Sequence, residues 1–551
     1  MTTKVFSHKQ AGLRAAIFAF TDSSFSTPFA GRRRWQRHCW SGFSLCLLLW
    51  LAPTLSGQTT WTGATNSDWN TASNWSAGVP TTSTHVIIPS ATNAPTIQAG
   101  TAAVANSVFV QTGGSLAIQN TGSLTINGTY NHGGATSCFR NQGTVANSGQ
   151  LVLGHTGSEN SWVLWNQATF NNNSGGEIRI DQFTLNGLVN ESGTFTNAAK
   201  IIIGANISGG FQGILNLATF NNNSGAEISI DRNVYFGLFN YSGTFTNTAK
   251  ITIGANNGTG WSGIRNEAVF FNNSGGEIAI DGSSRSALHN VSGTFTNAAK
   301  ITIGAIKAVG TEGIRNEATF HNNSGGDISI DRSTSTALLN TGSNATFTNA
   351  AKIALGTVDV FSMVGLQNEG TFQNNSSGEI SIDRNSSGGM YNASGTFTNA
   401  GKITVGANHS VGGGFLNDAT FHNNSGGEIS LDRLGLWNRG TFTNAAKITL
   451  GATASVGVEG ITNQSSFQNT PCTALINIVS NSIINNTGTF TNAGTIIENA
   501  SGNSSISSNT GVVQNFNGGD FNIGTNTGIL TTSTVTIWTG CVNTNWANSA
   551  N

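Results

Sequence analysis

The sequence predicts an all-β protein, a right-handed parallel β-helix (β-solenoid) whose coils of about 25 residues are arranged in alternating pairs. Three observations predict this fold. Phe recurs every 25 residues through the middle of the chain, an Asn stands two residues after each Phe, and a short I-x-I segment follows before the next turn. Period-two alternation bounded by Gly and Asn-Ser-Gly is typical of short strands and tight turns. Such strands bury their apolar faces by stacking coil on coil.

The Phe and Asn series predict two internal ladders, in which each residue stacks on its equivalent in the next coil. Val145 and Val513 occupy the same position before and after the Phe series, which gives about 16 coils. Asn suits this place because its amide both donates and accepts hydrogen bonds and tolerates turn conformations. The predicted ladder residues are Phe170, Phe195, Phe220, Phe245, Phe270, Phe295, Phe320, Phe347, Phe372, Phe397, Asn172, Asn197, Asn222 and Asn247.

Two kinds of coil alternate, so the full repeat is about 50 residues long. One kind carries an acidic residue just before I-x-I, as at Glu277, and the other carries Lys, as at Lys300. Strands stacked in register would therefore alternate opposite charges along an outer face. Each exposed pair contributes about 0.2 to 1 kcal/mol, so its main effect is to define the register.

Residues 1–57 are predicted to be a signal peptide with an extended basic region, which includes the run Arg32–Arg37. The apolar stretch Phe43–Ala52 is too short to cross a bilayer, which takes about 20 residues, and the small residues Ser56 and Gly57 mark a cleavage zone. We therefore expect a secreted or cell-surface protein with no transmembrane segment after cleavage. Removal of this segment takes away seven basic residues and one acidic residue and leaves a net charge of −7.

Three domains are predicted after the signal: residues 58–140 as a Trp-motif module with a cap and first coils, 141–525 as the solenoid, and 526–551 as a truncated second Trp-motif module. The last prediction comes from the matching spacing of Trp61 to Trp69 and of Trp538 to Trp546. It implies that the sequence is a fragment of a longer protein.

Composition excludes several classes of function. Only 9% of the residues are charged, which argues against nucleic acid as a partner. The cysteines outside the signal, Cys138, Cys472 and Cys541, lie far apart and form neither a disulfide framework nor a CxxC motif. We expect no cofactor and no metal.

The polar residues give no distinct catalytic set. Glu277 and Asp281 could be an acid and base pair or calcium ligands, but they recur in every second coil, whereas catalysis needs one assembled site. His321 and His422 follow ladder Phe residues and are expected to point outward. Thr residues flank the Phe positions as in insect-type ice-binding proteins, but alternate coils interrupt the second Thr series.

The segments between I-x-I and the next Asn differ from coil to coil and carry aromatic side chains. Exposed aromatic residues suit saccharide or protein partners, and solenoids place ligand contacts on such variable loops. The same side chains could instead close the corners of the solenoid. The candidate contacts are Phe183, Phe211, Tyr235, Phe236, Trp261, Phe361, Tyr391 and Trp437.

The opening segment Trp61–Pro80, with the VIIP motif at Val86–Pro89, resembles the start of β-helical modules in bacterial secreted and cell-surface proteins, including adhesins and autotransporter passengers. The resemblance implies a structural or adhesive surface rod without catalytic activity, with surface glycans or proteins as partners. The alternatives are a polysaccharide-binding or polysaccharide-degrading β-helix and, more remotely, an ice-binding protein. No counterpart of a pectate-lyase-like catalytic set is found in the sequence.

Overall fold

The computed structural model describes residues 57–131, 136–154, 161–206, 210–358, 363–409, 411–453, 459–471, 473–479, 483–498, 506–515 and 523–532. All of them belong to one compact unit, Leu55–Asn551. Residues 1–56 of the predicted signal peptide, most of the predicted second Trp-motif module, Phe361, Cys472 and Cys541 lie outside the described residues.

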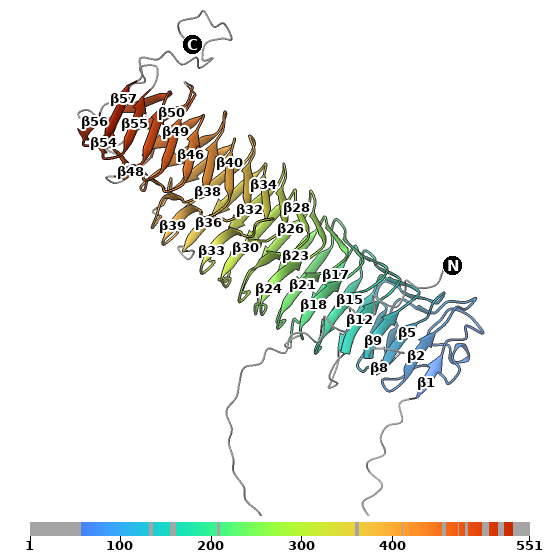
Figure 1. Ribbon diagram of the computed structural model, residues 1–551. Coiled ribbons are helices and arrows are strands. Elements are labelled where there is room, and N and C mark those ends of the chain that lie inside the picture. The colour runs from blue at the N-terminus through green and yellow to red at the C-terminus, as the bar shows by residue number, and fades with distance from the viewer. Residues whose placement is uncertain are drawn as a thin grey trace, which may run out of the picture. The chain divides into compact units, whose positions relative to one another are not determined.

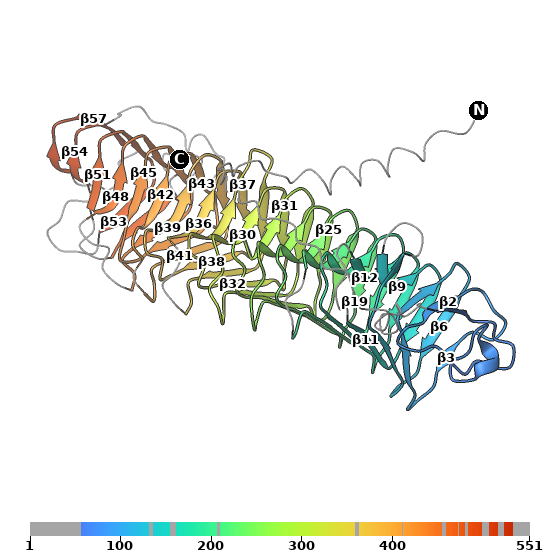
Figure 2. The ribbon, with the colours of Figure 1, turned by 90° about the horizontal axis from the view of Figure 1, so that it is seen from below.

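The described chain is a parallel β-solenoid of about 17 turns, as the sequence predicts. Each regular turn contributes one strand to each of three sheets, here named sheet 1, sheet 2 and sheet 3 in the order in which a turn visits them. Figures 1 and 2 show the turns stacked in chain order, so that each contacts the turns just before and after it. Handedness remains a prediction.

Sheet 1 is built from parallel strands, with β8 alone added antiparallel to β9. Its strands are β1 (Gln58–Thr60), β2 (His85–Ile88), β5 (Ser107–Val110), β8 (Tyr130–Asn131), β9 (Thr136–Asn141), β12 (Ser161–Asn166), β15 (Asn186–Asn190), β18 (Gln212–Asn216), β21 (Phe236–Asn240), β24 (Ser262–Asn266), β27 (Leu288–Asn290), β30 (Glu312–Asn316), β33 (Thr336–Asn340), β36 (Val364–Asn368), β39 (Gly388–Asn392), β42 (Phe415–Asn417), β45 (Leu436–Asn438), β48 (Glu459–Asn463), β51 (Ile483–Asn486), β54 (Ile506–Asn509) and β56 (Ile523–Asn526).

Sheet 2 carries the Phe series. Its strands are β3 (Thr96–Ile97), β6 (Ser115–Ile118), β10 (Thr144–Asn147), β13 (Thr169–Asn172), β16 (Thr194–Asn197), β19 (Thr219–Asn222), β22 (Thr244–Asn247), β25 (Val269–Asn272), β28 (Thr294–Asn297), β31 (Thr319–Asn322), β34 (Thr346–Asn349), β37 (Thr371–Asn374), β40 (Thr396–Asn399), β43 (Thr420–Asn423), β46 (Thr441–Asn444), β49 (Ser466–Asn469), β52 (Thr489–Asn492), β55 (Val512–Asn515) and β57 (Ile529–Thr532).

Sheet 3 carries the I-x-I segments. Its strands are β4 (Ala102–Ala105), β7 (Ser123–Ile126), β11 (Gln150–Gly154), β14 (Glu177–Asp181), β17 (Lys200–Ile203), β20 (Glu227–Ile230), β23 (Lys250–Ile253), β26 (Glu277–Ile280), β29 (Lys300–Ile303), β32 (Asp327–Ile330), β35 (Lys352–Leu355), β38 (Glu379–Ile382), β41 (Lys402–Val405), β44 (Glu428–Leu431), β47 (Lys447–Leu450), β50 (Leu475–Ile478) and β53 (Thr495–Glu498).

The core of each coil consists of the inward side chains of all three strands. The ladder Phe rings of sheet 2 are fully buried and stack along the solenoid, as between Phe270 and Phe295, whose centroids are 4.6 Å apart with planes 7° from parallel. The ladder extends beyond the Phe series at both ends, because Leu116 occupies its position in β6 and Leu530 occupies it in β57. The stack thus extends beyond the 16 coils counted from sequence.

Asn side chains form two buried ladders, one at the end of sheet 1 strands and one at the end of sheet 2 strands. The Nδ2 of Asn297 donates to Oδ1 of Asn322 at 2.8 Å, and also to the carbonyl of Ala299 in its own corner at 2.9 Å. Each amide therefore links neighbouring coils and fixes the corner that follows its strand. An unpaired buried amide would be costly, so the ladder requires an Asn in each successive coil.

The charge alternation predicted on sheet 3 is present. Lys300 pairs in register with Glu277 and Asp327, and its Nζ lies 3.2 Å from Oε1 of Glu277. Both side chains are about half exposed, so the pair contributes little to stability.

From β20 onward, a buried Asp follows each strand that begins with an acidic residue and holds the loop of the next coil. Asp331 accepts hydrogen bonds from the Oγ1 of Thr357 and the N–H of Val358. The next residue, Arg332, has a φ of 49° and donates to the carbonyls of Gly304 and Ala305 in the preceding loop. Together these two residues, named here the Asp-Arg turn, connect three successive loops.

The N-terminal end of the stack packs three indole rings. Trp61 and Trp69 each contact Trp75 edge to face, at centroid distances of 4.8 and 4.7 Å, and the 3₁₀ helix η1 (Ala72–Asn74) immediately precedes Trp75. The Trp motif is thus part of the core that closes this end of the described coils.

Candidate functional site

Coil-to-coil variation is concentrated on the outer face of sheet 1. Successive side chains of a strand point to opposite faces, so the residue just before each ladder Asn points outward. In β24, β27 and β30 that residue is Arg265, His289 and Arg315, aligned in register. The inward positions on either side keep an aliphatic residue and Asn.

Three aromatic rings and one guanidinium align where the variable loops enter sheet 1. We call Phe211, Tyr235, Trp261 and Arg285 the corner column. Phe211 stacks on Tyr235 with centroids 4.7 Å apart and planes 12° from parallel, and Trp261 meets Tyr235 at 4.8 Å and 67°. The guanidinium carbon of Arg285 lies 4.5 Å from the Trp261 ring centroid, which is a cation–π contact.

A second row of rings continues from the corner column across the face of the sheet. Phe236 contacts Phe239 at 5.2 Å, and Phe239 contacts Tyr241 at 5.4 Å. Arg265 lies over Phe236 and Phe239 at 5.4 and 5.6 Å and donates from Nε to Glu267 at 2.7 Å. Aromatic surface thus covers the sheet from one corner to the other within two neighbouring strands.

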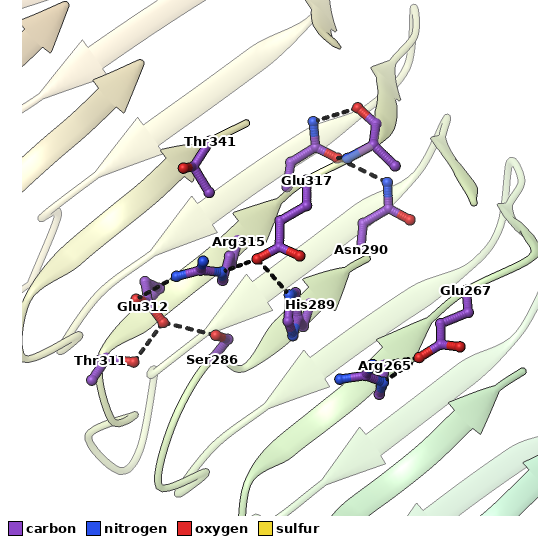
Figure 3. Close-up of polar contacts among 12 residues, drawn as sticks. Arg265, Glu267, Ser286, His289, Asn290, Thr311, Glu312, Arg315, Glu317 and Thr341 are labelled. Atoms are coloured by element: carbon purple, nitrogen blue, oxygen red, sulfur yellow. Dashed lines mark hydrogen bonds and ion pairs between the residues drawn. The ribbon is translucent and has the colours of Figure 1, made fainter. Parts of the chain in front are cut away.

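Beyond the rings, the same face carries the polar network of Figure 3. Arg315 donates to Glu317 at 2.6 Å and lies 3.5 Å from Glu312, and the Glu312 carboxylate accepts from Ser286 at 2.7 Å. His289 lies between them on the neighbouring strand, with Nε2 3.3 Å from Glu317. The two groups form an ion pair only when the imidazole is protonated, and Nε2 of His289 has no hydrogen-bond partner.

Burial sets the titration of His289. Desolvation lowers its pKa below the usual 6.5, and this outweighs the opposing attraction of Glu317. The pKa of Glu317 is lowered by Arg315 and His289 in spite of its own burial. The network therefore holds a neutral imidazole beside an ionised carboxylate at neutral pH.

Two further aromatic clusters lie on sheet 1. Near its C-terminal end, Tyr391 donates to Asp418 at 3.0 Å and Arg439 binds the same carboxylate through two nitrogens at 2.6 and 2.7 Å. Burial and the hydrogen bond to Asp418 raise the pKa of Tyr391, whereas the bonds from Arg439 and Tyr391 lower the pKa of Asp418 against the opposing effect of its own burial. Trp437 follows in the same row with 54% of its surface exposed.

The third cluster lies near the N-terminal end. The guanidinium of Arg140 is 4.2 Å from the Trp165 ring and 5.1 Å from the Phe109 ring. Trp165 donates through Nε1 to Glu191 at 2.9 Å. All three clusters therefore combine aromatic rings with guanidinium groups.

The structure separates the aromatic candidates identified from sequence. It brings Phe211, Tyr235, Phe236 and Trp261 into contact. Tyr391 and Trp437 lie elsewhere on the face, in one row but two coils apart, with Leu416 between them. Phe183 is 4% exposed and belongs to the core, because its ring turns inward beside Gly187. The prediction that Phe183 is a surface contact is therefore wrong. Phe236 is also largely buried, at 9%, and supports the rings around it.

The repeated polar candidates have structural contacts. Glu277 faces outward to Lys300, whereas Asp281 is buried and accepts from the N–H groups of Ile306 and Lys307. Glu277 thus pairs with the next strand of sheet 3, whereas Asp281 holds the loop of the next coil. His321 and His422 lie at outward positions of β31 and β43, each beside Thr in the neighbouring strands. Among the described residues, no cluster of three or more His, Cys, Asp or Glu is arranged to hold a metal ion.

Sequence reasoning missed Arg140, Phe239, Arg265, Arg285 and His289. The first, second, third and fifth stand directly before a ladder Asn, at a position that varies in every coil, and this variation was a usable signal. Arg285 could have been found by adding one coil length to Trp261.

Within the described ranges, no helix is both long enough and apolar enough to span a membrane. Burial raises the pKa of the Cys138 thiol to about 12, so this cysteine is not a reactive nucleophile.

The crystal structure of a TibC-catalyzed hyper-glycosylated TibA55-350 fragment is similar at 14% identity and a TM-score of 0.13, covering 81% of this chain and 96% of that chain. No curated protein matches the chain. A family model described as a domain of unknown function (DUF8693) matches residues 60–177, which comprise the tryptophan end of the stack and its first coils.

Proposed function

We propose that this protein is an exported, non-catalytic rod that binds a partner at a cell surface or in the surrounding matrix through the outer face of sheet 1. The observation that carries the proposal is the location of its aromatic and guanidinium clusters, all three of which lie on that face. The outer faces of sheets 2 and 3 instead carry repeated Thr positions and alternating charge pairs. A rigid stack with one variable face suits recognition rather than catalysis.

Exposed aromatic surface favours a binding role for this face. Phe211 and Trp437, from two of the three clusters, present aromatic surface to solvent at 45% and 54% exposed. Tyr, Trp and Arg are also the residues that dominate binding energy at interfaces. Export follows from the predicted signal in residues 1–57.

A saccharide is the second candidate partner of the same face, and the aligned rings of Phe211, Tyr235 and Trp261 favour it. Carbohydrate rings bind aromatic side chains through apolar C–H groups while their hydroxyls bind polar neighbours. Degradation of a saccharide is not part of the proposal.

The test is binding of the fluorescently labelled full chain to intact cells and to printed glycan and protein arrays. A variant with Arg140→Ala, Trp261→Ala and Trp437→Ala alters all three clusters. A matched control with Lys200→Ala, Lys300→Ala and Lys402→Ala alters the outer face of sheet 3. We expect the first variant to lose binding and the control to keep it, with similar melting temperatures. Equal losses in both would contradict the proposal.

A further inference from the structure

We infer that the corner column of Phe211, Tyr235, Trp261 and Arg285 is a binding site for a linear acidic saccharide, one that carries carboxylates as uronic acid residues. The inference deepens the proposed function and rests on it. It names the ligand class for one part of the sheet 1 face.

Arg285 is the first reason. Every other arginine that the structure describes has a carboxylate, amide or carbonyl acceptor within the protein. Arg285 is exposed, and among the described residues its contact is the Trp261 ring. A guanidinium fixed over a ring presents a planar set of donors to solvent, which matches the geometry of a carboxylate.

The neighbouring groups are also donors. No described group accepts a hydrogen bond from the Tyr235 hydroxyl or from Nε1 of Trp261. Two carboxylates lie on the neighbouring part of the face, and both have partners. Glu267 is bound to Arg265, and Glu312 accepts from Ser286 and Thr311 and pairs with Arg315. The column therefore offers donors and a positive charge, while these carboxylates are held by other residues.

The orientation of the rings also favours an anionic ligand. Phe211 and Tyr235 stack face to face along the solenoid, so the faces of the rings, which are electronegative, cover one another. Their edges, which are electropositive, are directed away from the stack. Ring edges attract anionic oxygen, so this arrangement adds to the preference of Arg285.

The spacing of the column favours a saccharide over a peptide. Its groups come from four successive coils, with a rise of about 4.8 Å per coil, which is comparable to the length of one pyranose residue in a linear chain. An extended peptide advances about 3.3 Å per residue and would lose register with the column. A linear glycan along the solenoid axis can place one sugar beside each coil.

The experiment is isothermal titration calorimetry of the full chain with a mannuronate hexamer, with neutral mannohexaose and with hexaglutamate. We expect the mannuronate hexamer to bind and its affinity to fall as salt rises. Arg285→Ala should weaken binding about tenfold, the order expected for loss of a charge-assisted hydrogen bond. Arg285→Lys, which keeps the charge but not the planar fork, should fall between, and Trp261→Ala should also weaken binding.

The controls change matched side chains on other faces. Lys300→Ala removes one exposed positive charge from sheet 3, and Phe271→Ala removes one half-buried ring from sheet 2. Both should bind the mannuronate hexamer as the unchanged chain does.

Three results would overturn the inference: equal binding of mannohexaose, equal or tighter binding of hexaglutamate, or no binding of the mannuronate hexamer. Each leaves the proposed function intact if array or cell binding still depends on the sheet 1 face. Loss of that dependence overturns the proposed function instead.

Discussion

Phe270 and Phe271 are adjacent in β25 but occupy different environments. Phe270 is fully buried between Phe245 and Phe295, whereas Phe271 points outward and is half-buried. Substituting each of these two residues in turn therefore distinguishes the contribution of core packing from that of surface packing.

We expect Phe270→Ala to lower the free energy of unfolding by about 3 to 5 kcal/mol, because it leaves a cavity between two stacked rings. Phe271→Ala should cost about 1 kcal/mol or less, since its side chain keeps contact with water. Denaturant unfolding of the two variants measures the difference. Equal losses would show that the Phe ladder does not carry the core.

His289 gives a pH dependence whose sign follows from its lowered pKa. The unfolded chain takes up a proton near pH 6.5, whereas the folded chain does so only at lower pH, so stability is complete above 6.5 and declines as pH falls below it. His289→Gln should flatten this decline relative to the unchanged chain. Thermal unfolding across pH 4 to 8 tests this, and a steeper decline in the variant would contradict the lowered pKa.

Sequence was sufficient for residues that repeat and insufficient for residues that vary. Phe295 and Asn297 could be placed because a stack repeats the same environment in each coil, so their spacing records their contacts. The corner column could not be placed as a unit, because contact between Phe211, Tyr235 and Trp261 depends on loops that differ in sequence. Phe183 shows the same limit, since only its backbone path turns the ring inward.

At the scale of elements, the Arg of the Asp-Arg turn is replaced in two coils, by Gln182 and by Gly282, and at Gly282 the next coil compensates. Gly282 stands where Arg232 and Arg332 stand in other coils, and all three have positive φ. A Cβ at Gly282 would lie 2.9 Å from Cα of Gly258, so a larger residue does not fit. Lys307 of the following coil instead donates its Nζ to the carbonyl of Asn256.

We expect Lys307→Ala to lower the free energy of unfolding by about 0.5 to 1.5 kcal/mol through loss of this hydrogen bond. Lys300→Ala, which removes an exposed charge from sheet 3, should have a smaller effect. Denaturant midpoints of both variants measure the contrast. A larger effect at Lys300 would show that the loop contact of Lys307 does not replace the missing Arg.

At the scale of the whole molecule, the structural unit is a pair of coils. Deletion of residues 267–316 removes two coils and leaves Lys250 beside Asp327 in sheet 3. Deletion of residues 267–290 removes one coil and leaves Lys250 beside Lys300. The shorter deletion also removes Asp281 but keeps the loop at Ile306 and Lys307 that Asp281 holds.

We expect the two-coil deletion to melt close to the unchanged chain and the one-coil deletion to melt at a lower temperature, because like charges meet and a loop loses its Asp. High salt should remove only the part of the difference that comes from charge. Calorimetry at low and high salt tests this. Equal melting temperatures at low salt would contradict a two-coil unit.

The Asn ladders give the rod a direction. In the ladder bonds each Nδ2 donates toward the coil that follows, as from Asn141 to Asn166 and from Asn486 to Asn509, while Oδ1 of Asn316 also accepts from the N–H of Ala318 in its own corner. One inverted amide would set donor against donor on one side and acceptor against acceptor on the other. Each coil thus passes its orientation to the next, and the aligned amides add their dipoles along the axis. A coil added at either end would therefore have to adopt the same amide orientation as the coils already present.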